Sequence, residues 1–113
     1  MKVTIEVTSA FAKNFKKLSK KYRSLKQDIA LLQESLLENP YTGTKISEEF
    51  YKIRLQIKSK GKGKSGGGRV ISFVEEGEET TLVVLMKLYD KSDQSSVTVV
   101  ELREILEEFN SKR

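Results

Sequence analysis

The sequence of 113 residues contains neither cysteine nor histidine. Without cysteine, the chain can form no disulfide framework and has no thiolate nucleophile. Without either residue type, the common zinc sites and the histidine-assisted nucleophiles lack the groups on which they depend. Any acid–base catalysis must therefore use lysine, arginine, tyrosine, aspartate or glutamate. We accordingly predict no metal site and no small-molecule cofactor.

Long hydrophobic runs are also missing. No stretch approaches the roughly 18 apolar residues that a membrane span needs, and the strand-like VTIEV follows Met1 where a signal peptide would carry its hydrophobic region. We therefore expect a cytoplasmic protein without membrane contact. The length fits a single domain over residues 1–113, and the 37% hydrophobic and 33% charged residues fit a modest core under a highly charged surface.

Positive charge is concentrated in one part of the chain. Residues 1–74 hold 16 Lys and Arg against 6 Asp and Glu, whereas residues 75–113 hold 5 against 10. A segregated basic excess indicates a polyanionic partner for the first part, such as RNA or DNA. A merely solvated basic face is the alternative that charge alone leaves open.

The hydrophobic pattern predicts an α+β fold with an antiparallel sheet. Apolar residues alternate with polar ones in the predicted strands and recur at helical spacing in the predicted helices. The link between the two N-terminal helices is so short that they must form an antiparallel hairpin. The predicted elements are a strand over residues 2–7, a helix over about 9–22, a helix from a capping box at Ser24 and Gln27 to Asn39-Pro40, strands over 51–58, 69–74 and 81–89, a tight turn around Gly77, and a helix that begins at a capping box formed by Thr98 and Glu101.

Residues 58–69 read KSKGKGKSGGGR and contain five of the seven glycines. A phosphate-binding P-loop needs a glycine five residues before the glycine of its GK pair, but Lys58 occupies that position relative to Gly63, and a strand rather than a helix is predicted to follow. Two interpretations of residues 58–68, the basic segment, remain. It is a flexible connection between strands, or it is a phosphate-binding surface whose glycines let the backbone approach a nucleic acid.

The second interpretation explains the positions of the cations. Lysines alternate along the basic segment, the preceding strand directs Lys52 and Arg54 to its open face, and Arg69 begins the next strand. Fixed cations on a sheet with mobile cations above them would bind phosphates in a salt-dependent and largely sequence-independent way. We therefore predict an RNA-binding surface. The lysines assigned to it are Lys58, Lys60, Lys62, Lys64 and Lys87.

The stretch YKIRLQIKSKGKGKSGGGRVISFV, followed after a hydrophobic strand by LYDKS, resembles the RelE/ParE superfamily of bacterial toxins and is most similar to its HigB-type branch. The likeness extends over most of the chain and includes the Lys-rich helical hairpin and the closing strand and helix. It implies a RelE-like fold of order β-α-α-β-β-β-α and a small antitoxin protein as partner. Most RelE- and HigB-like members cut messenger RNA in the ribosomal A site, whereas the ParE branch inhibits DNA gyrase.

The resemblance also implies an active site, in which a ribose 2′-hydroxyl attacks the neighbouring phosphate. The arginines would stabilise the charge that develops on the phosphate oxygens, Lys52 would protonate the leaving 5′-oxygen, and Tyr89 would orient the 2′-hydroxyl or stack on a base. Several RNA-cutting relatives have a histidine or tyrosine near the C-terminus, and here Tyr89 or Asp90 would have to substitute for it. The residues implied as catalytic are Lys52, Arg54, Arg69, Tyr89 and Lys91.

Three functions remain open from the sequence. They are a ribosome-dependent mRNA endoribonuclease, a gyrase-binding toxin of the ParE type without nuclease activity, and a nucleic-acid-binding module without activity. The clustered cations Lys52, Arg54 and Arg69 favour the first, with an antitoxin and ribosome-bound mRNA as partners, while the missing histidine keeps the second open. Because such a site is poorly equipped to position its own substrate, we expect the ribosome to supply the orientation.

Overall fold

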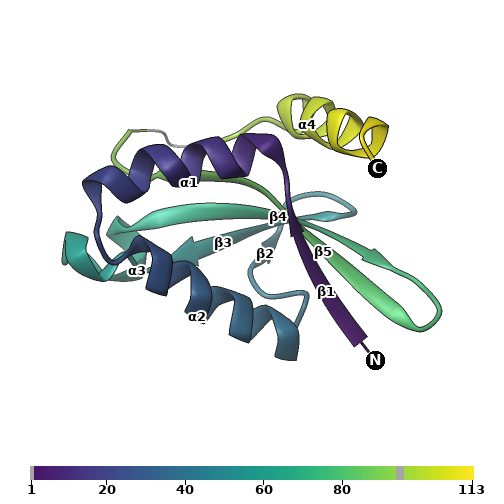
Figure 1. The fold of residues 1–113 in the computed structure, drawn as a ribbon, viewed down its shortest axis with the longest axis horizontal. Helices are drawn as coiled ribbons and strands as arrows, with labels where there is room; N and C mark the ends of the chain where they lie inside the picture. The colour runs from purple at the N-terminus through teal and green to yellow at the C-terminus, as the bar shows by residue number, and fades with distance from the viewer. Residues whose placement is uncertain (1, 94–95) are drawn as a thin grey trace.

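The structure, a computed structural model, describes residues 2–93 and 96–113 (Figure 1). No helix in this part of the chain combines the length and the apolar character that a membrane span requires. The elements in chain order are β1 (Lys2–Val7), α1 (Ser9–Lys21), α2 (Leu25–Glu38), β2 (Thr44–Lys45), β3 (Phe50–Leu55), the 3₁₀ helix η1 (Lys58–Lys60), α3 (Gly63–Gly66), β4 (Gly68–Glu76), β5 (Thr80–Asp90) and α4 (Val99–Ser111).

The strands form one sheet in the order β1-β5-β4-β3-β2. Strands β2 to β5 pair antiparallel, as predicted, but β1 pairs parallel with β5, which was not predicted. Apolar alternation indicates which face of a strand is buried but not its direction relative to a neighbour, so the sequence pattern could not reveal this pairing. As a result, β1 forms one edge of an otherwise antiparallel sheet, and the short β2 forms the other.

Each face of the sheet buries its own hydrophobic core. Helices α1 and α2 run antiparallel across one face, as predicted, and pack against residues that include Ile53, Leu55 and Val83 (Figure 1). Helix α4 covers part of the opposite face, where Leu102 packs in one cluster with Met86. Because β5 lies between these layers, most of its residues are buried, as its apolar sequence predicts.

Threonine caps the start of α1 and of α4. The hydroxyl of Thr8 accepts a hydrogen bond from Phe11 N at 3.0 Å, and the hydroxyl of Thr98 accepts one from Glu101 N at 3.1 Å. Each bond satisfies a backbone N–H that has no partner within the first helical turn. The second bond confirms the helix start predicted at Thr98.

The capping box predicted at Ser24 is wrong. Ser24 has helical dihedral angles, φ −83° and ψ −7°, and its side chain makes no bond to the backbone of α2. A capping side chain needs an extended backbone at this position. The Ser24 hydroxyl instead donates to Asp28 Oδ2 at 2.7 Å and accepts the Ser59 N–H at 2.8 Å, so it ties the helical hairpin to the basic segment.

The basic segment is folded into short helical turns rather than being an extended loop. It contains η1 and α3, and Gly61 and Gly63 adopt positive φ angles of 73° and 65°. At Gly67, a Cβ atom would lie 2.2 Å from the carbonyl oxygen of Leu55, so only glycine fits. The sequence predicted a strand that continues to Lys58, whereas β3 ends at Leu55. These turns depend on positive φ angles and on a close approach of the backbone. Neither feature alters the pattern of hydrophobic residues, so the sequence pattern could not predict the turns.

Candidate functional site

Cross-strand pairing gathers Arg54, Arg69 and Tyr89 in one row. In β3, β4 and β5 these residues lie directly opposite one another. Directly opposite side chains point to the same face of a sheet with Cβ atoms about 5 Å apart. Like charges in such positions destabilise the pairing unless other groups compensate them. The pairing of Arg54 with Arg69 therefore concentrates positive charge on this face.

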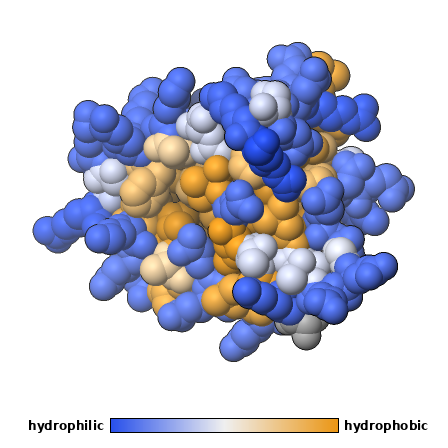
Figure 2. Space-filling view, turned by 45° about the vertical axis from the view of Figure 1, so that its right-hand side comes forward, coloured by the Kyte–Doolittle hydropathy of each residue, from blue (hydrophilic) through white to orange (hydrophobic). Residues whose placement is uncertain are grey.

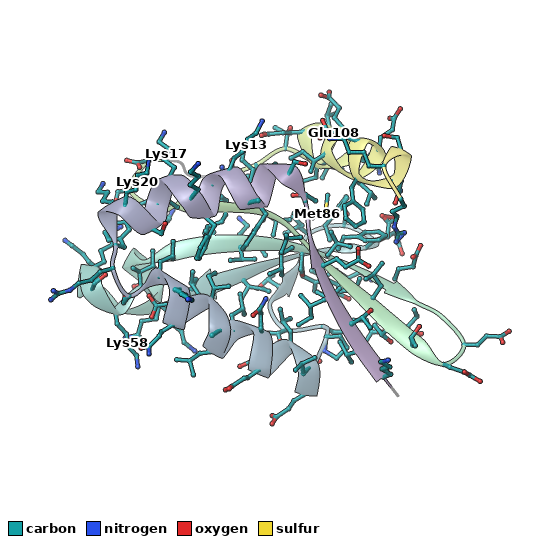
Figure 3. All side chains as sticks on the ribbon, viewed as in Figure 1. Lys13, Lys17, Lys20, Lys58, Met86 and Glu108 are labelled. Atoms are coloured by element: carbon teal, nitrogen blue, oxygen red, sulfur yellow. The ribbon has the colours of Figure 1, made fainter. Side chains whose placement is uncertain are left out.

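A β-bulge in β5 brings Tyr89 to this face. The register shifts after Ile71, so that Ile71 pairs with Lys87 and Met86 has no partner in β4. Met86, labelled in Figure 3, and Tyr89 both pack in the core on the side of α4. Strict alternation from Met86 would turn Tyr89 to the opposite face, and the extra residue of the bulge corrects this. Lys52 pairs with Ile71, so it extends the cationic face by one row.

Arg69 is buried and holds the basic segment in place. Its Nη1 donates to the carbonyl oxygens of Lys64 at 3.1 Å and Gly68 at 2.9 Å, and its Nη2 donates to the carbonyl oxygen of Ser65 at 3.2 Å. These bonds satisfy carbonyl groups at the end of α3. Among the described residues, Nε and one hydrogen of Nη2 are left for another acceptor, because a guanidinium carries further N–H donors. Arg69 therefore has both a structural role and remaining capacity to bind an anion.

The hydroxyl of Tyr89 is buried and has no hydrogen-bond partner among the described residues. Burial raises the pKa of Tyr89, and the charge of Arg69 offsets this effect only in part. The phenol is therefore protonated at neutral pH, so it can donate or accept a hydrogen bond but cannot serve as a phenolate base. An unsatisfied buried hydroxyl costs stability, and the buried hydroxyl of Ser72 also lacks a partner among the described residues. A substrate would reach the Tyr89 hydroxyl only after a neighbouring segment moves.

Lys52 and Arg54 are cations of this face for which the described residues provide no ion-pair partner. Lys52 is half-buried and Arg54 is exposed. In the part of the chain that the structure describes, neither of them forms an ion pair. Their charge is therefore available to an external anion.

Asp90 anchors the basic segment to the end of β5. It is only 2% exposed, its Oδ1 accepts a hydrogen bond from Lys60 Nζ at 2.6 Å, and its Oδ2 accepts one from Tyr22 Oη at 2.5 Å. Burial alone would raise the pKa of Asp90, but the hydrogen bonds from Lys60, Tyr22 and Ser92 outweigh it and hold this pKa well below its ordinary value. A fully bonded carboxylate of low pKa is a weak base, so Asp90 is unsuited to replace the missing histidine.

The predicted RNA-binding lysines have different surroundings. The Lys60 side chain is only 9% exposed because Asp90 binds its ammonium group, and Lys87 is paired with Glu101 of α4. The sequence predicted that both lysines face solvent. In the structure, each ammonium instead binds a carboxylate from another part of the chain. The other lysines predicted to bind RNA, Lys58, Lys62 and Lys64, are exposed, and so is Lys91, which the resemblance implied as catalytic.

One cleft joins the basic segment to the helical hairpin. Arg54, Lys58 and Lys64 line it together with Leu31 and Ser35 of α2. The cleft therefore combines three cationic side chains with partly apolar residues of α2, and Asp28 is the acidic residue in its lining. Within residues 2–93 and 96–113, no three Asp, Glu, His or Cys side chains gather in a way that could hold a metal ion.

Sequence reasoning missed the unit formed by Tyr22, Lys60 and Asp90. A signal was available, because Asp90 ends a strand of mostly buried residues and a buried carboxylate requires a partner. The partners could not be identified, because Tyr22 lies 68 positions away from Asp90 along the chain.

Comparison with known proteins relates this geometry to a known fold. No family model matches the chain. Among solved structures, the chain is similar to a double arginine mutant of the E. coli toxin RelE in the free state, with a TM-score of 0.59 and 16% identity over 96% of this chain and 98% of that chain. At this identity the likeness shows the fold alone. It confirms the predicted RelE-like α+β fold, whereas assignment to the HigB-type branch stays a prediction.

Proposed function

We propose that this protein is the toxin of a toxin–antitoxin pair and acts as a ribosome-dependent mRNA endoribonuclease of the HigB type. The observation that carries the proposal is the row of Arg54, Arg69 and Tyr89 on one face of a RelE-like fold, with Lys52 in the adjoining row. Cationic donors beside a neutral hydroxyl are the groups that a reacting phosphodiester requires. The similar solved structure is itself described as a toxin, which agrees with the proposal.

The proposed reaction is an internal transesterification of RNA. The ribose 2′-oxygen attacks the adjacent phosphorus, a bond between these two atoms forms, and the bond from phosphorus to the 5′-oxygen breaks. The products are a cyclic phosphate and a free 5′-hydroxyl. Arg54 and the remaining hydrogens of Arg69 stabilise the negative charge that accumulates on the phosphate oxygens. Lys52 donates the proton that the leaving 5′-oxygen takes up, and Tyr89 orients the 2′-hydroxyl through a hydrogen bond.

No side chain of this site is assigned as the general base. The carboxylate of Asp90 is already bonded to Lys60 and Tyr22, and burial keeps Tyr89 protonated. The proton of the 2′-hydroxyl therefore passes to water or to a group of the ribosome. Without a positioned base, most of the rate enhancement must come from orientation of the RNA. For this reason the proposal requires the ribosome, and free RNA should be cut very little.

We also propose a cognate antitoxin that carries an acidic segment. The cleft lined by Arg54, Lys58 and Lys64 has a partly apolar wall on α2. An acidic amphipathic segment would complement both its charge and its apolar side chains. Binding there would also cover Arg54 and so block access of RNA to the site.

A gyrase inhibitor of the ParE type, without nuclease activity, is the second candidate. The observation in its favour is that Arg69 and Lys87 already have protein partners, whereas Lys52 and Arg54 form no ion pair with any described residue. In this case the same cations would form a contact surface rather than an active site.

Toxicity of active-site variants in growing bacteria tests the nuclease proposal. Lys52→Ala with Arg54→Ala removes two cations that form no ion pair in the described part of the chain, so the fold should persist while growth arrest is lost. The matched control is Lys13→Ala with Lys17→Ala, because these lysines project from α1 into solvent (Figure 3). The control should remain toxic. Full toxicity of the first variant would contradict a catalytic role for these cations.

A further inference from the structure

The outer edge of β1 is an unpaired strand edge. Lys2 N donates to Glu79 O at 3.4 Å and Thr8 N donates to Leu85 O at 3.1 Å, which shows that the even-numbered residues direct their backbone groups toward β5. The backbone N–H and C=O groups of the odd-numbered residues between them therefore point away from the sheet. Among the described residues, no other strand pairs with this edge.

Of the features that normally protect such strands, this edge has two charged side chains, Lys2 and Glu6, and lacks others. The sequence KVTIEV of β1 contains no proline, and within the described residues no bulge interrupts its pairing with β5. Figure 2 turns the side that carries β1 and α4 toward the viewer and shows a hydrophobic patch across its middle. Val7 in β1 is 43% exposed and Leu37 in α2 is 53% exposed. An open edge beside exposed apolar side chains is an expected site of association.

The sequence of β1 is complementary to itself when two copies pair antiparallel. With Thr4 opposite Thr4 of a second copy, each Lys2 lies opposite a Glu6, and each Val3 lies opposite an Ile5. Val3 and Ile5 carry the outward-pointing backbone groups, so each Val3–Ile5 pair exchanges hydrogen bonds. The Lys2–Glu6 pairs occupy non-hydrogen-bonded positions, where side chains approach most closely.

We propose that a second copy of this chain pairs with β1 and forms a symmetric dimer in which the two sheets become continuous. Charge selects the register. A shift by one step, with Ile5 opposite Ile5, would place Lys2 opposite Thr8 and Glu6 opposite Thr4, and both ion pairs would be lost. An interface in which the same patch serves both copies is the usual form of a symmetric dimer.

The dimer is expected to be weak. A single strand edge with its flanking side chains buries less area than a standard protein interface, so dimerisation should appear only as the protein concentration rises. It does not involve Lys52, Arg54 or Tyr89, and it is independent of the proposed nuclease activity.

Analytical ultracentrifugation of the purified protein over a range of concentrations tests the proposal. The wild type should shift from the monomer mass toward twice that mass. Lys2→Glu places two glutamates opposite each other at both ends of the paired strands, and Glu6→Lys places two lysines there. Each variant alone should dimerise about tenfold more weakly than the wild type. Lys13→Glu, which changes an exposed charge on α1, should dimerise like the wild type.

An equimolar mixture of the Lys2→Glu and Glu6→Lys variants gives the sharpest result. Every charged position of one variant then lies opposite the complementary charge of the other, so the mixture should form a heterodimer although neither variant dimerises well alone. A wild-type protein that stays monomeric at every concentration would overturn the proposal and leave the edge of β1 to a strand from a different protein. A dimer that is insensitive to both charge reversals would place the interface elsewhere and overturn it as well.

Discussion

The polar groups buried near the end of β5 have two different roles. Asp90 is fully bonded to Lys60 and Tyr22, whereas the Tyr89 hydroxyl beside it has no hydrogen-bond partner within residues 2–93 and 96–113. A satisfied network stabilises the fold, and an unsatisfied hydroxyl weakens it. Substitution of Asp90 should therefore lower stability, whereas substitution of Tyr89 should lower activity without lowering stability.

Replacement of Asp90 by asparagine should lower the free energy of unfolding by about 3 kcal/mol at neutral pH, because the buried Lys60 ammonium loses its counter-charge. The folded-state pKa of Asp90 is depressed, so its contribution is complete above the unfolded pKa of about 4 and is lost as pH falls below that value. The stability difference between wild type and Asp90→Asn should therefore narrow in acid. Urea denaturation at several pH values measures it.

The control for this prediction is Asp93→Asn, which removes an exposed carboxylate in the turn after β5. That variant should match the wild type in stability at every pH. A difference between wild type and Asp90→Asn that is constant from neutral to acid pH would show that charge is not the stabilising property of Asp90.

Tyr89→Phe should separate function from folding. Removal of a buried hydroxyl without a partner should leave the free energy of unfolding unchanged or raise it by up to about 1 kcal/mol. Cleavage of ribosome-bound mRNA should nevertheless fall about tenfold or more, because the hydroxyl is proposed to orient the attacking group. In contrast, Tyr22→Phe should lower stability, since Tyr22 donates to Asp90 at 2.5 Å. Undiminished cleavage by Tyr89→Phe would remove Tyr89 from the site.

At the scale of elements, the sequence predicted the type and order of the long helices and strands. The buried stripe of α2, which includes Leu25, Ile29 and Leu36, follows directly from its helical spacing. The direction of β1, the short strand β2 and the turns of the basic segment were not predictable in this way. Each of these features depends on contacts between distant segments or on backbone conformation. Such contacts and conformations do not produce a periodic pattern of hydrophobic residues in the sequence.

The candidate site shows the same division. The alternation of Lys52 and Arg54 predicted their shared face, and the structure places Arg69 and Tyr89 beside them. The partner groups of Lys60 and Arg69 could not be predicted, because the carboxylate of Asp90 and the carbonyls of α3 come into reach only in the folded chain.

The glycines of the basic segment give a prediction about an element. Gly67→Ala should destabilise the protein by about 2 kcal/mol or more, because the new Cβ would overlap the backbone of β3. Gly61→Ala should cost only about 1 kcal/mol, since Gly61 has a positive φ but nothing within 4 Å of the added atom. Thermal and urea denaturation compare the two. Equal losses of stability in the two variants would mean that the backbone around Gly67 shifts easily to make room for a Cβ atom.

At the scale of the whole molecule, the basic excess of residues 1–74 is divided among several surfaces. Lys13, Lys17 and Lys20 project from α1, while Lys58 projects from the basic segment (Figure 3). Four of the ten acidic residues of the C-terminal part, including Glu108, lie on α4, and four others lie at the end of β4 and in the turn that leads to β5. A protein with such a distribution should bind RNA through counterion release and therefore in a salt-dependent manner.

Salt titrations of RNA binding distinguish free lysines from anchored ones. The triple substitution of Lys58, Lys62 and Lys64 by alanine should reduce the slope of log K against log salt concentration by about 2, since each lost phosphate contact on a single strand removes about 0.7. Lys60→Ala should leave this slope unchanged and lower stability instead, because its ammonium is bound to Asp90. A smaller slope for Lys60→Ala would show that this lysine leaves Asp90 to bind RNA.

The most direct test of the proposed activity is to map new 5′ ends on an end-labelled message, using purified protein with and without translating ribosomes. We expect new ends only when ribosomes are present, and none with Lys52→Ala and Arg54→Ala in one chain. Cleavage of free RNA at the same rate would contradict the dependence on the ribosome. The absence of new ends under both conditions, from a protein that still arrests growth, would contradict the nuclease proposal itself and favour the gyrase-inhibitor alternative.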